Sequence, residues 1–404
     1  MPISGLTTIR AAVDAGPAPA SATAPEALAG KRPLRTLFLT GSLVHGGAER
    51  HTITLANKLT ERGHQCHVAY VKNDPSQLDR LRDPASVQWL GATRYFDPRA
   101  VNALANLLKR VQPSSILAAN QYAMMYAQLA RHLARVRIPL VVTWHTTVLQ
   151  TAKERFQMLY YRPMFQATDC LVYVCQAQQR YWEERAVRSR RRNDVIYNGV
   201  DTAHWMPMGA VESLAKRREL GLADEDFVIG LSAVLRPEKN HLQLVEAVAA
   251  LRQRGVRARA LMIGDGPMRE AIESRARELG IADHVIITGL QKEVRPFIAA
   301  CDTVVLTSFA EAFPLAAVEA MAMRKPVVHS EVGGAPEMIR PGQEGELFPV
   351  RDTGAFVDRL LRLQDPAARV RMGGIARETV EAKFSERAMI DRYERMLTEV
   401  EAGR

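Results

Sequence analysis

The chain has 404 residues, of which 47% are hydrophobic and 24% are charged, and its formal net charge is +10. This composition is typical of a soluble globular protein and excludes a fibrous or fully disordered chain, while the length favours two domains over one. The positive charge suits an anionic partner, but basic and aromatic residues are not interleaved as in nucleic-acid-binding modules, so we expect no nucleic acid among the partners.

The chain begins with a segment, residues 1–30, that is rich in Ala, Pro, Gly, Ser and Thr and poor in large apolar residues, which predicts a disordered tail. No apolar run approaches the roughly 20 residues that cross a bilayer, and no secretory signal is recognisable, so we expect a cytoplasmic protein. The cysteines have neither metal-ligand nor disulfide spacing and are predicted to be buried free thiols. They are Cys66, Cys170, Cys175 and Cys301.

The first half of the chain alternates short apolar runs with helical patterns, which predicts a parallel sheet with crossover helices. We therefore predict an N-terminal Rossmann-like domain over residues 31–203. Its predicted strands are residues 36–40, 66–71, 115–118, 140–143 and 171–174.

The same alternation begins again after Asn198-Gly199-Val200-Asp201, and the Asn-Gly pair with the polar stretch behind it predicts a hinge at residues 198–210. A second doubly wound domain is predicted over residues 204–383, and residues 384–401 have helical spacing. The fold class is therefore α/β, with two Rossmann-like parallel-sheet domains that face a central cleft. The predicted strands of the second domain are residues 227–231, 258–263, 285–288, 303–307 and 327–329.

A glycine-rich loop within TGSLVHGGAER, residues 40–50, follows the first predicted strand and precedes an amphipathic helix that runs through Leu59. Glycines let a backbone approach a ligand closely, and a helix start presents free amides to it. The loop lacks the G-x-G-x-x-G pattern of dinucleotide sites, so a tight strand-to-helix turn remains the structural alternative.

A second loop, LRPEKNH at residues 235–241, lies between a predicted strand and a helix that begins near Leu242. Arg236 and Lys239 beside a helix N-terminus suit a diphosphate, whose charge must be stabilised when it leaves. An exposed capping loop is the alternative.

A third motif, SFAEAFPLAAVEAM at residues 308–321, contains two glutamates around Pro314. Pro314 is predicted to be the first helical residue, which places Glu311 at a strand end and Glu319 inside the helix. We expect one carboxylate to face a sugar hydroxyl and the other a ribose, with the amides of residues 313–315 directed at phosphates. A solvated pair of glutamates is the alternative.

Together these motifs resemble the family 4 retaining glycosyltransferases of GT-B fold, the glycosyl transferase group 1, and the likeness extends from about residue 35 to the C-terminus. Its strongest part is the pair Glu311 and Glu319, followed by VGGAPE at residues 332–337 and supported by IGDGP at residues 263–267. The hinge sequence and the GGAE loop at residues 46–49 are also similar to that family.

The resemblance implies retention of configuration without a protein nucleophile, with the leaving diphosphate helping to deprotonate the acceptor. It assigns the diphosphate to Arg236 and Lys239, the donor sugar hydroxyls to Glu311, the ribose to Glu319 and an active-site role to His145. A core residue at a strand end is the alternative for His145. The implied donor site also includes Gly47, Gly264, Gly266, Leu290, Phe313, Pro314 and Leu315.

One position departs from the family pattern. Many members carry an arginine five residues before the lysine, where this chain has Val234, and we expect Arg236 to supply that charge. The resemblance implies no cofactor and no metal, because cations and helix dipoles neutralise the diphosphate. The Asp224-Glu225-Asp226 triplet is similar to the metal-binding Asp-x-Asp of another glycosyltransferase class, but it precedes a strand in a turn, so we interpret it as surface.

The partners implied by the resemblance are a nucleotide-sugar donor and a glycan or lipid-linked acceptor. The acceptor is expected to be bound by the first domain, and the final helix is expected to pack back on that domain. The reaction implied is hexose transfer in cell-envelope, lipopolysaccharide or exopolysaccharide biosynthesis.

Two basic segments carry an alternative at the membrane. Residues 188–192 are predicted to be a solvated loop or helix end, and residues 153–162, with Tyr160 and Tyr161, a core-packed amphipathic helix. For both, the alternative is peripheral contact with an anionic membrane at its inner face.

Two other functions stay open at this point. GT-B-fold epimerases also bind nucleotide sugars between two Rossmann-like domains, although they lack the glutamate pair at this spacing. A non-catalytic nucleotide-sugar-binding protein is the third possibility, motivated by the basic charge and by Val234.

Overall fold

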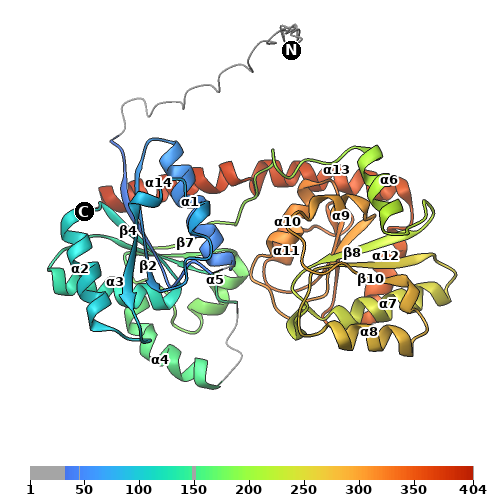
Figure 1. Cartoon of the computed structure of the whole chain (residues 1–404), viewed down its shortest axis with the longest axis horizontal. Helices are drawn as coiled ribbons and strands as arrows, with labels where there is room; N and C mark the ends of the chain where they lie inside the picture. Colours follow the sequence, from blue (N-terminus) through green and yellow to red (C-terminus); the bar gives the residue numbers. More distant parts are fainter. Residues whose placement is uncertain (1–31, 45, 148–151, 404) are drawn as a thin grey trace, which may run out of the picture.

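The computed structural model describes residues 32–44, 46–147 and 152–403, with the side chains of residues 152–155 left aside. The predicted tail, residues 1–30, lies outside the described residues. Two lobes stand side by side, each built on its own parallel sheet (Figure 1). The predicted pair of doubly wound domains is thereby confirmed.

The first sheet has the strand order β3-β2-β1-β4-β5-β6-β7, with every neighbouring pair parallel. All five predicted strands are present, and two more that were not predicted lie at its edges. Its elements are β1 (Arg35–Thr40), α1 (Gly47–Glu61), β2 (Gln65–Lys72), β3 (Val87–Ala92), α2 (Pro98–Val111), β4 (Ser115–Ala119), α3 (Asn120–Ala134), β5 (Leu140–Trp144), α4 (Ala152–Gln166), β6 (Cys170–Tyr173), α5 (Gln176–Glu183) and β7 (Asn193–Val195).

The second sheet has the order β10-β9-β8-β11-β12-β13, again all parallel. The five predicted strands are present, and β13 is an additional edge strand. The elements of this lobe are α6 (Ala210–Glu219), β8 (Phe227–Ser232), α7 (His241–Gln253), β9 (Ala258–Ile263), α8 (Arg269–Glu278), β10 (Val285–Ile287), α9 (Arg295–Ala300), β11 (Thr303–Leu306), α10 (Leu315–Ala322), β12 (Val327–Ser330), α11 (Ala335–Met338), β13 (Gly345–Phe348), α12 (Thr353–Arg362) and α13 (Pro366–Lys383).

The last helix, α14 (Glu386–Ala402), crosses back and packs on the first lobe, where it lies along the top of Figure 1. Its buried face joins the same core as Phe38 of β1 and Leu55 of α1. The residues of that face are Met389, Ile390, Tyr393, Met396 and Leu397. An ion pair between Arg62 and Asp391, 2.6 Å long, fastens the helix further.

The two segments that cross between the lobes are bonded to each other. The backbone N–H of Val200 donates to the carbonyl of Phe384 at 3.0 Å, and that of Glu386 donates to the carbonyl of Val200 at 2.8 Å. A Cβ at Gly199 would lie 2.4 Å from the carbonyl oxygen of Ser385, so glycine permits this close approach. The predicted hinge at residues 198–210 thus contains one of the two segments that connect the lobes, and these segments are hydrogen-bonded to each other.

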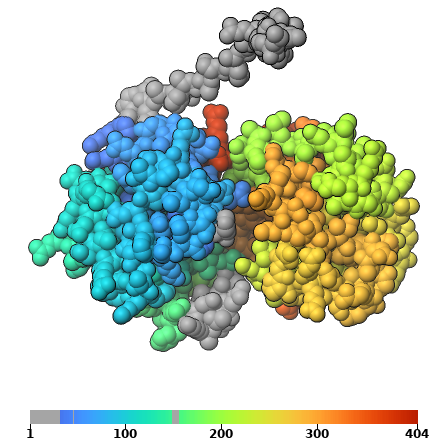
Figure 2. All heavy atoms as spheres, in the orientation of Figure 1, coloured from blue at the N-terminus to red at the C-terminus, as the bar shows by residue number. Residues whose placement is uncertain are grey.

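The order of the strands places one switch point in each sheet, between β1 and β4 and between β8 and β11. In open parallel sheets, ligands bind in the crevice beyond the carboxyl ends of the strands at such a point. The groove between the lobes is visible in Figure 2. None of the helices in the described ranges has the length and apolarity to span a bilayer.

Three smaller predictions need correction. Asp226 of the acidic triplet is buried, where its carboxylate accepts the N–H of Ala223 at 3.0 Å, while Asp224 and Glu225 are exposed as expected. Cys66 is only partly buried, whereas the other three cysteines are buried, and all four are free thiols. Pro314 precedes α10 rather than starting it, because its ψ of 121° is extended.

Candidate active site

The groove between the lobes holds a cavity of about 600 Å³ lined by both of them. The first lobe contributes Gly47 and residues from the start of α1, together with His145 after β5. The second contributes residues of the loop that leads into α10, Glu311, Phe313 and Leu315. This cavity therefore touches several of the predicted donor-site residues from both sides.

A second cavity, of about 250 Å³, lies within the second lobe at its switch point. Arg236 and Lys239 line it from the loop after β8, and Ser308 and Pro314 from the loop after β11. Glu311 and Leu315 border both cavities, so the two spaces adjoin. The predicted diphosphate cations and the first glutamate are thus brought together.

Lys239 and Glu311 form the centre of this arrangement. Lys239 Nζ lies 2.5 Å from Glu311 Oε1, and the Ser308 hydroxyl donates to the same oxygen at 2.7 Å. A hydrogen bond from a side chain to the backbone holds the loops after β8 and β11 together, since the Thr307 hydroxyl donates to the carbonyl of Lys239 at 2.9 Å. A carboxylate oxygen that accepts from two such donors is held in a fixed orientation.

Arg236 is held more loosely than Lys239. Its side chain is 59% exposed and its nearest ion-pair partner, Glu238, is 3.9 Å away. An exposed guanidinium at the rim of the smaller cavity can turn toward an incoming anion and bind it through two donors. Val234 itself is 46% exposed and lines the same cavity.

Glu319 faces the other lobe. It is buried on α10, and its partner is Arg50 near the start of α1, at 3.6 Å across the groove. Burial raises the pKa of Glu319, and the positive charge of Arg50 opposes that rise. Glu319 borders neither of the two cavities, so the predicted ribose ligand is engaged by an arginine in this structure.

His145 lies at the first lobe's edge of the groove, where its backbone N–H donates to Asn120 Oδ1 at 2.9 Å. Its ring packs edge-on against that of His51, with 4.9 Å between centroids, and His51 packs on Tyr393 at 5.2 Å. Burial lowers the pKa of His145 to about 4 and that of His51 well below its usual value. Both imidazoles are therefore neutral at neutral pH, and among the described residues neither Nε2 has a hydrogen-bond partner.

Arg50 and His51 are the two residues that sequence reasoning missed. Both lie within the first turns of α1, directly after the glycine-rich loop whose Gly47 begins the helix. A cation and an imidazole at the start of a helix that leaves a strand end are a recognisable signal, although their partners belong to distant segments.

Two predicted donor glycines have a structural explanation in this structure. Gly264 and Gly266 have φ values of 150° and 158°, and a Cβ on them would lie 2.1 Å from the Ala233 carbonyl oxygen and 2.7 Å from that of Leu235. They border neither cavity described above. Their role is to let the loop after β9 lie against the loop that carries Arg236.

Leu290, which the resemblance includes in the donor site, lies apart from both cavities. It follows β10, the outermost strand of its sheet, and its side chain is 85% exposed. Its place in the donor site, which the resemblance implies, stays a prediction.

The VGGAPE motif, residues 332–337, packs against the loop that carries Glu311 and also contacts α5 of the first lobe. A Cβ at Gly333, which has a φ of 51°, would lie 1.9 Å from the carbonyl oxygen of Glu311, so this glycine lets the loop pack under the glutamate. Glu337 accepts the backbone N–H groups of Gln176 and Ala177 of α5, at 2.9 and 2.8 Å. The motif thereby joins the two lobes beside the site.

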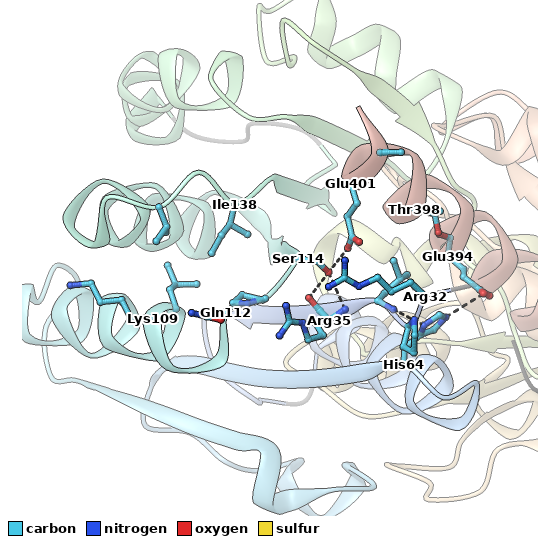
Figure 3. Close-up of a pocket in the computed structure, with 16 residues that line it drawn as sticks. Arg32, Arg35, His64, Lys109, Gln112, Ser114, Ile138, Glu394, Thr398 and Glu401 are labelled. Atoms are coloured by element: carbon cyan, nitrogen blue, oxygen red, sulfur yellow. Dashed lines mark hydrogen bonds and ion pairs between the residues drawn. The ribbon is translucent and has the colours of Figure 1, made fainter. Parts of the chain in front are cut away.

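A hollow of about 790 Å³, larger than these two cavities, lies at the opposite end of the first sheet (Figure 3). Here Glu401 of α14 accepts a hydrogen bond from Ser114 at 2.6 Å, and the N–H of Leu34 donates to His64 Nδ1 at 3.1 Å. The first contact joins α14 to the residue before β4, and the second joins the residues that precede β1 and β2. Because ligands of such sheets bind at the carboxyl ends, the groove between the lobes is the better candidate.

Two family models match the chain. The one described as "Glycosyl transferases group 1" matches residues 212–379, and the one described as "Glycosyltransferase Family 4" matches residues 45–204.

Among similar proteins, the N-acetyl-alpha-D-glucosaminyl L-malate synthase of Bacillus anthracis is 26% identical over 369 residues, covering 88% of this chain and 94% of that protein. The lipopolysaccharide core biosynthesis glycosyltransferase LpsE of Rhizobium meliloti (strain 1021) is 26% identical over 359 residues, 87% of this chain and 96% of that protein. An alignment to EpsD of Bacillus subtilis (strain 168), 29% identical, spans only 59% of that protein.

Among solved structures, Alr3699/HepE of Anabaena in complex with UDP is similar with a TM-score of 0.80 and 23% identity, covering 91% of this chain and 100% of that one. This likeness shows a shared fold.

Proposed function

Since the chain belongs to the family 4 glycosyltransferases, the glycosyl transferases group 1, and has their GT-B fold, we propose that it transfers a hexose from a nucleoside-diphosphate sugar with retention of configuration. We propose a glycan or lipid-linked acceptor in cell-envelope or exopolysaccharide biosynthesis, as the name of the Rhizobium relative suggests. UDP is the first nucleotide to test, because the Anabaena neighbour was solved with it.

The observation that carries the proposal is the Lys239 and Glu311 pair at the switch point, directly beside the cavity that His145 lines. Lys239 and Arg236 stabilise the diphosphate as the bond from the sugar C1 to the phosphate oxygen breaks. Glu311, oriented by Lys239 and Ser308, accepts hydrogen bonds from the sugar hydroxyls. A carboxylate bound by two donors is a weak nucleophile, which favours a transfer without a covalent enzyme intermediate.

In the proposed reaction, the acceptor oxygen forms a bond to C1 on the face from which the diphosphate departs, and its proton passes to the leaving diphosphate. The imidazole of His145 is neutral, and its Nε2 has no hydrogen-bond partner among the described residues, so it is available to hydrogen-bond the transferred sugar. No metal is needed in this scheme, because Arg236 and Lys239 supply the charge. Undiminished turnover in the presence of EDTA is the expected result.

The proposal is tested by calorimetry with UDP and GDP, followed by release of nucleoside diphosphate from UDP-hexoses over an acceptor panel. The anomeric configuration of the product, read by NMR, decides retention. Incubating the donor without acceptor separates the alternatives, because an epimerase converts the donor into an isomer. Tight nucleotide binding with no turnover of any donor would instead indicate a binding protein.

The membrane contact also enters as a proposal. Helix α4 buries Met158 and Tyr161, as predicted for a core-packed helix. Three large hydrophobic or aromatic side chains of the same helix are exposed to solvent. Phe156, Leu159 and Tyr160 are 76%, 54% and 63% exposed. Together with the net charge of +10, this suits the inner face of an anionic membrane. The loop at residues 188–192 is solvated as predicted, with Arg188, Arg190 and Arg191 exposed.

Sedimentation with vesicles tests the membrane proposal. Wild-type protein is expected to bind anionic vesicles, and a variant with Phe156 and Tyr160 both changed to Ser is expected to bind less. Equal binding by the two proteins would contradict it.

A further inference from the structure

A lysine and two tyrosines form a compact group at the carboxyl edge of the first sheet, away from the donor cations. Lys72 Nζ lies 4.9 Å from the ring centroid of Tyr122 and 5.9 Å from that of Tyr95. The two rings are 4.9 Å apart and tilted by 45°. We call these three residues the Lys72 platform.

The platform stands at the switch point of its sheet. Lys72 is the last residue of β2, and Tyr122 is the third residue of α3, which follows β4. Strand β1 runs between β2 and β4. The Tyr122 ring touches Gly41 at the end of β1, where a Cβ would lie 3.3 Å from it. By the rule for parallel sheets, this is where the first lobe binds its ligand.

The platform is also linked to the proposed catalytic groove. Asn120, two residues before Tyr122, accepts the backbone N–H of His145 at 2.9 Å. The loop that starts at Gly41 leads to Gly47, which lines the cavity between the lobes. A molecule resting on the platform therefore lies beside the histidine that borders the transfer site.

The ammonium group of Lys72 contacts two rings but is otherwise open to solvent. Its side chain is exposed, and no ion pair of Lys72 occurs within the described ranges. Asp97, the carboxylate nearest to Tyr95 in sequence, is buried and accepts the N–H groups of Thr93 and Arg99. The first turn of α3 contains no acidic residue. Lys72 therefore places an exposed ammonium group beside two aromatic rings.

These features match one class of ligand. Aromatic rings pack against the apolar face of a sugar, and an ammonium group held over them attracts an anionic substituent. We propose that the Lys72 platform binds an acidic acceptor, a sugar that carries a phosphate or a carboxylate and receives the transferred hexose. This inference rests on the proposed function, because it names the acceptor of that reaction.

The first experiment does not need turnover. Lys72 is acetylated in the whole protein, with UDP present, and its modification rate is followed by mass spectrometry with glucose 6-phosphate, glucuronate or glucose as probe. We expect an acidic probe to slow acetylation of Lys72 at least about threefold and glucose to have no such effect. Lys109, an exposed lysine of α2 at the opposite end of the sheet, is the internal reference.

The two acidic probes distinguish the sources of the charge. Protection by glucose 6-phosphate alone assigns a phosphate-bearing acceptor, protection by glucuronate alone a carboxylate-bearing one, and protection by both a general acidic class. Equal rates with glucose and with both acidic sugars would overturn the inference. Nucleotide binding, measured separately by calorimetry, reports on the proposed function, so the two can fail independently.

The second experiment uses Lys72→Met, which keeps an apolar stem over the Tyr122 ring and removes only the charge. The KM for an acidic acceptor is expected to rise about tenfold, the loss typical of one hydrogen bond to a charged group, with donor KM unchanged. Lys72→Arg is expected to restore most of the affinity, and Lys109→Met to change nothing. A Lys72→Met enzyme with the wild-type KM for acidic acceptors would contradict the inference.

Discussion

The two sheet edges that face the groove are built from different chemistry. At the edge of the second sheet, the loops after β8 and β11 are bonded to each other and carry a lysine and a glutamate 2.5 Å apart. At the edge of the first sheet, neutral rings predominate, including His51 and His145, and Lys72 lies over tyrosine faces. The edge of the second sheet thus presents fixed charged groups, whereas the edge of the first sheet presents ring faces with one exposed cation, Lys72.

The largest effect is expected where the charged edge is broken. Lys239→Ala removes the cation beside Glu311 and leaves the departing diphosphate less stabilised, so kcat is expected to fall about 100-fold or more. Steady-state release of nucleoside diphosphate measures the change. Lys239→Arg should retain more activity than the alanine variant. Lys325→Ala is not a suitable control, because the Lys325 ammonium donates to the carbonyls of Ala299 and Cys301 and therefore contributes to the fold.

Lys292→Ala is a suitable control for that experiment, since Lys292 is exposed and outside both cavities. It should leave kcat unchanged. Activity of Lys239→Ala within a factor of about two of wild type would refute the assignment of the donor edge.

The neutral state of the His145 imidazole, at the edge of the first sheet, can be tested through the pH dependence of the free energy of unfolding. Burial lowers the pKa of His145 to about 4, from 6.5. Between these two values the unfolded chain binds a proton that the folded chain does not, so the free energy of unfolding falls as the pH falls through this window.

His145→Gln removes this contribution. From about pH 7 to about pH 4.5, urea unfolding should show wild type losing about 2 kcal/mol more than the variant. The control is His204→Gln, which changes an exposed histidine. Parallel curves for wild type and His145→Gln would mean that His145 is not held neutral.

Sequence and structure agree best where the information is local. The strands on either side of each switch point were predicted from apolar runs, and the loops with Arg236, Lys239 and Glu311 were each predicted to follow such a strand. The family resemblance then implied that the three residues share one site. The unpredicted strands, β3, β7 and β13, all lie at sheet edges. Strand β7 has three residues, two of them polar, and β13 contains Glu346, which is buried and faces Arg359 at 3.7 Å.

What the sequence could not reveal depends on distant contacts. His51 meets His145 only after the first lobe has folded, and Arg50 meets Glu319 only after the two lobes have come together. No local spacing encodes either pair. The position of Leu290 depends on strand order, because β10 is outermost only in the assembled sheet. Helical periodicity, by contrast, was enough to predict the apolar face of α14.

The contact between the two edges is expected to have a moderate effect. Burial raises the pKa of Glu319 above 4.5 and Arg50 counters it. A buried carboxyl with a raised pKa makes the folded state less stable as the pH rises above the unfolded value, and removing Arg50 increases that loss.

Arg50→Ala should therefore cost about 1–2 kcal/mol at about pH 7, below the usual cost of breaking a buried pair because Arg50 is 44% exposed, and little at about pH 4.5. Thermal unfolding at the two pH values measures it, and adding Glu319→Gln should remove the pH dependence. Arg80→Ala, which removes another cation lining the groove, is the control. A pH-independent loss in Arg50→Ala would show that packing, not charge, explains the contact.

The smallest effect is expected from a pair of leucines that sequence alone treats alike. Leu315 borders both cavities, whereas Leu290 is 85% exposed at the outer strand. Leu290→Ser should leave UDP affinity unchanged and the free energy of unfolding within about 0.5 kcal/mol of wild type, while Leu315→Ser should weaken UDP binding measured by calorimetry. Equal weakening of UDP binding by Leu290→Ser and Leu315→Ser, at unchanged stability, would contradict this expectation. The nucleotide would then have to extend from the switch point to β10, and its binding site would be wider than the two cavities.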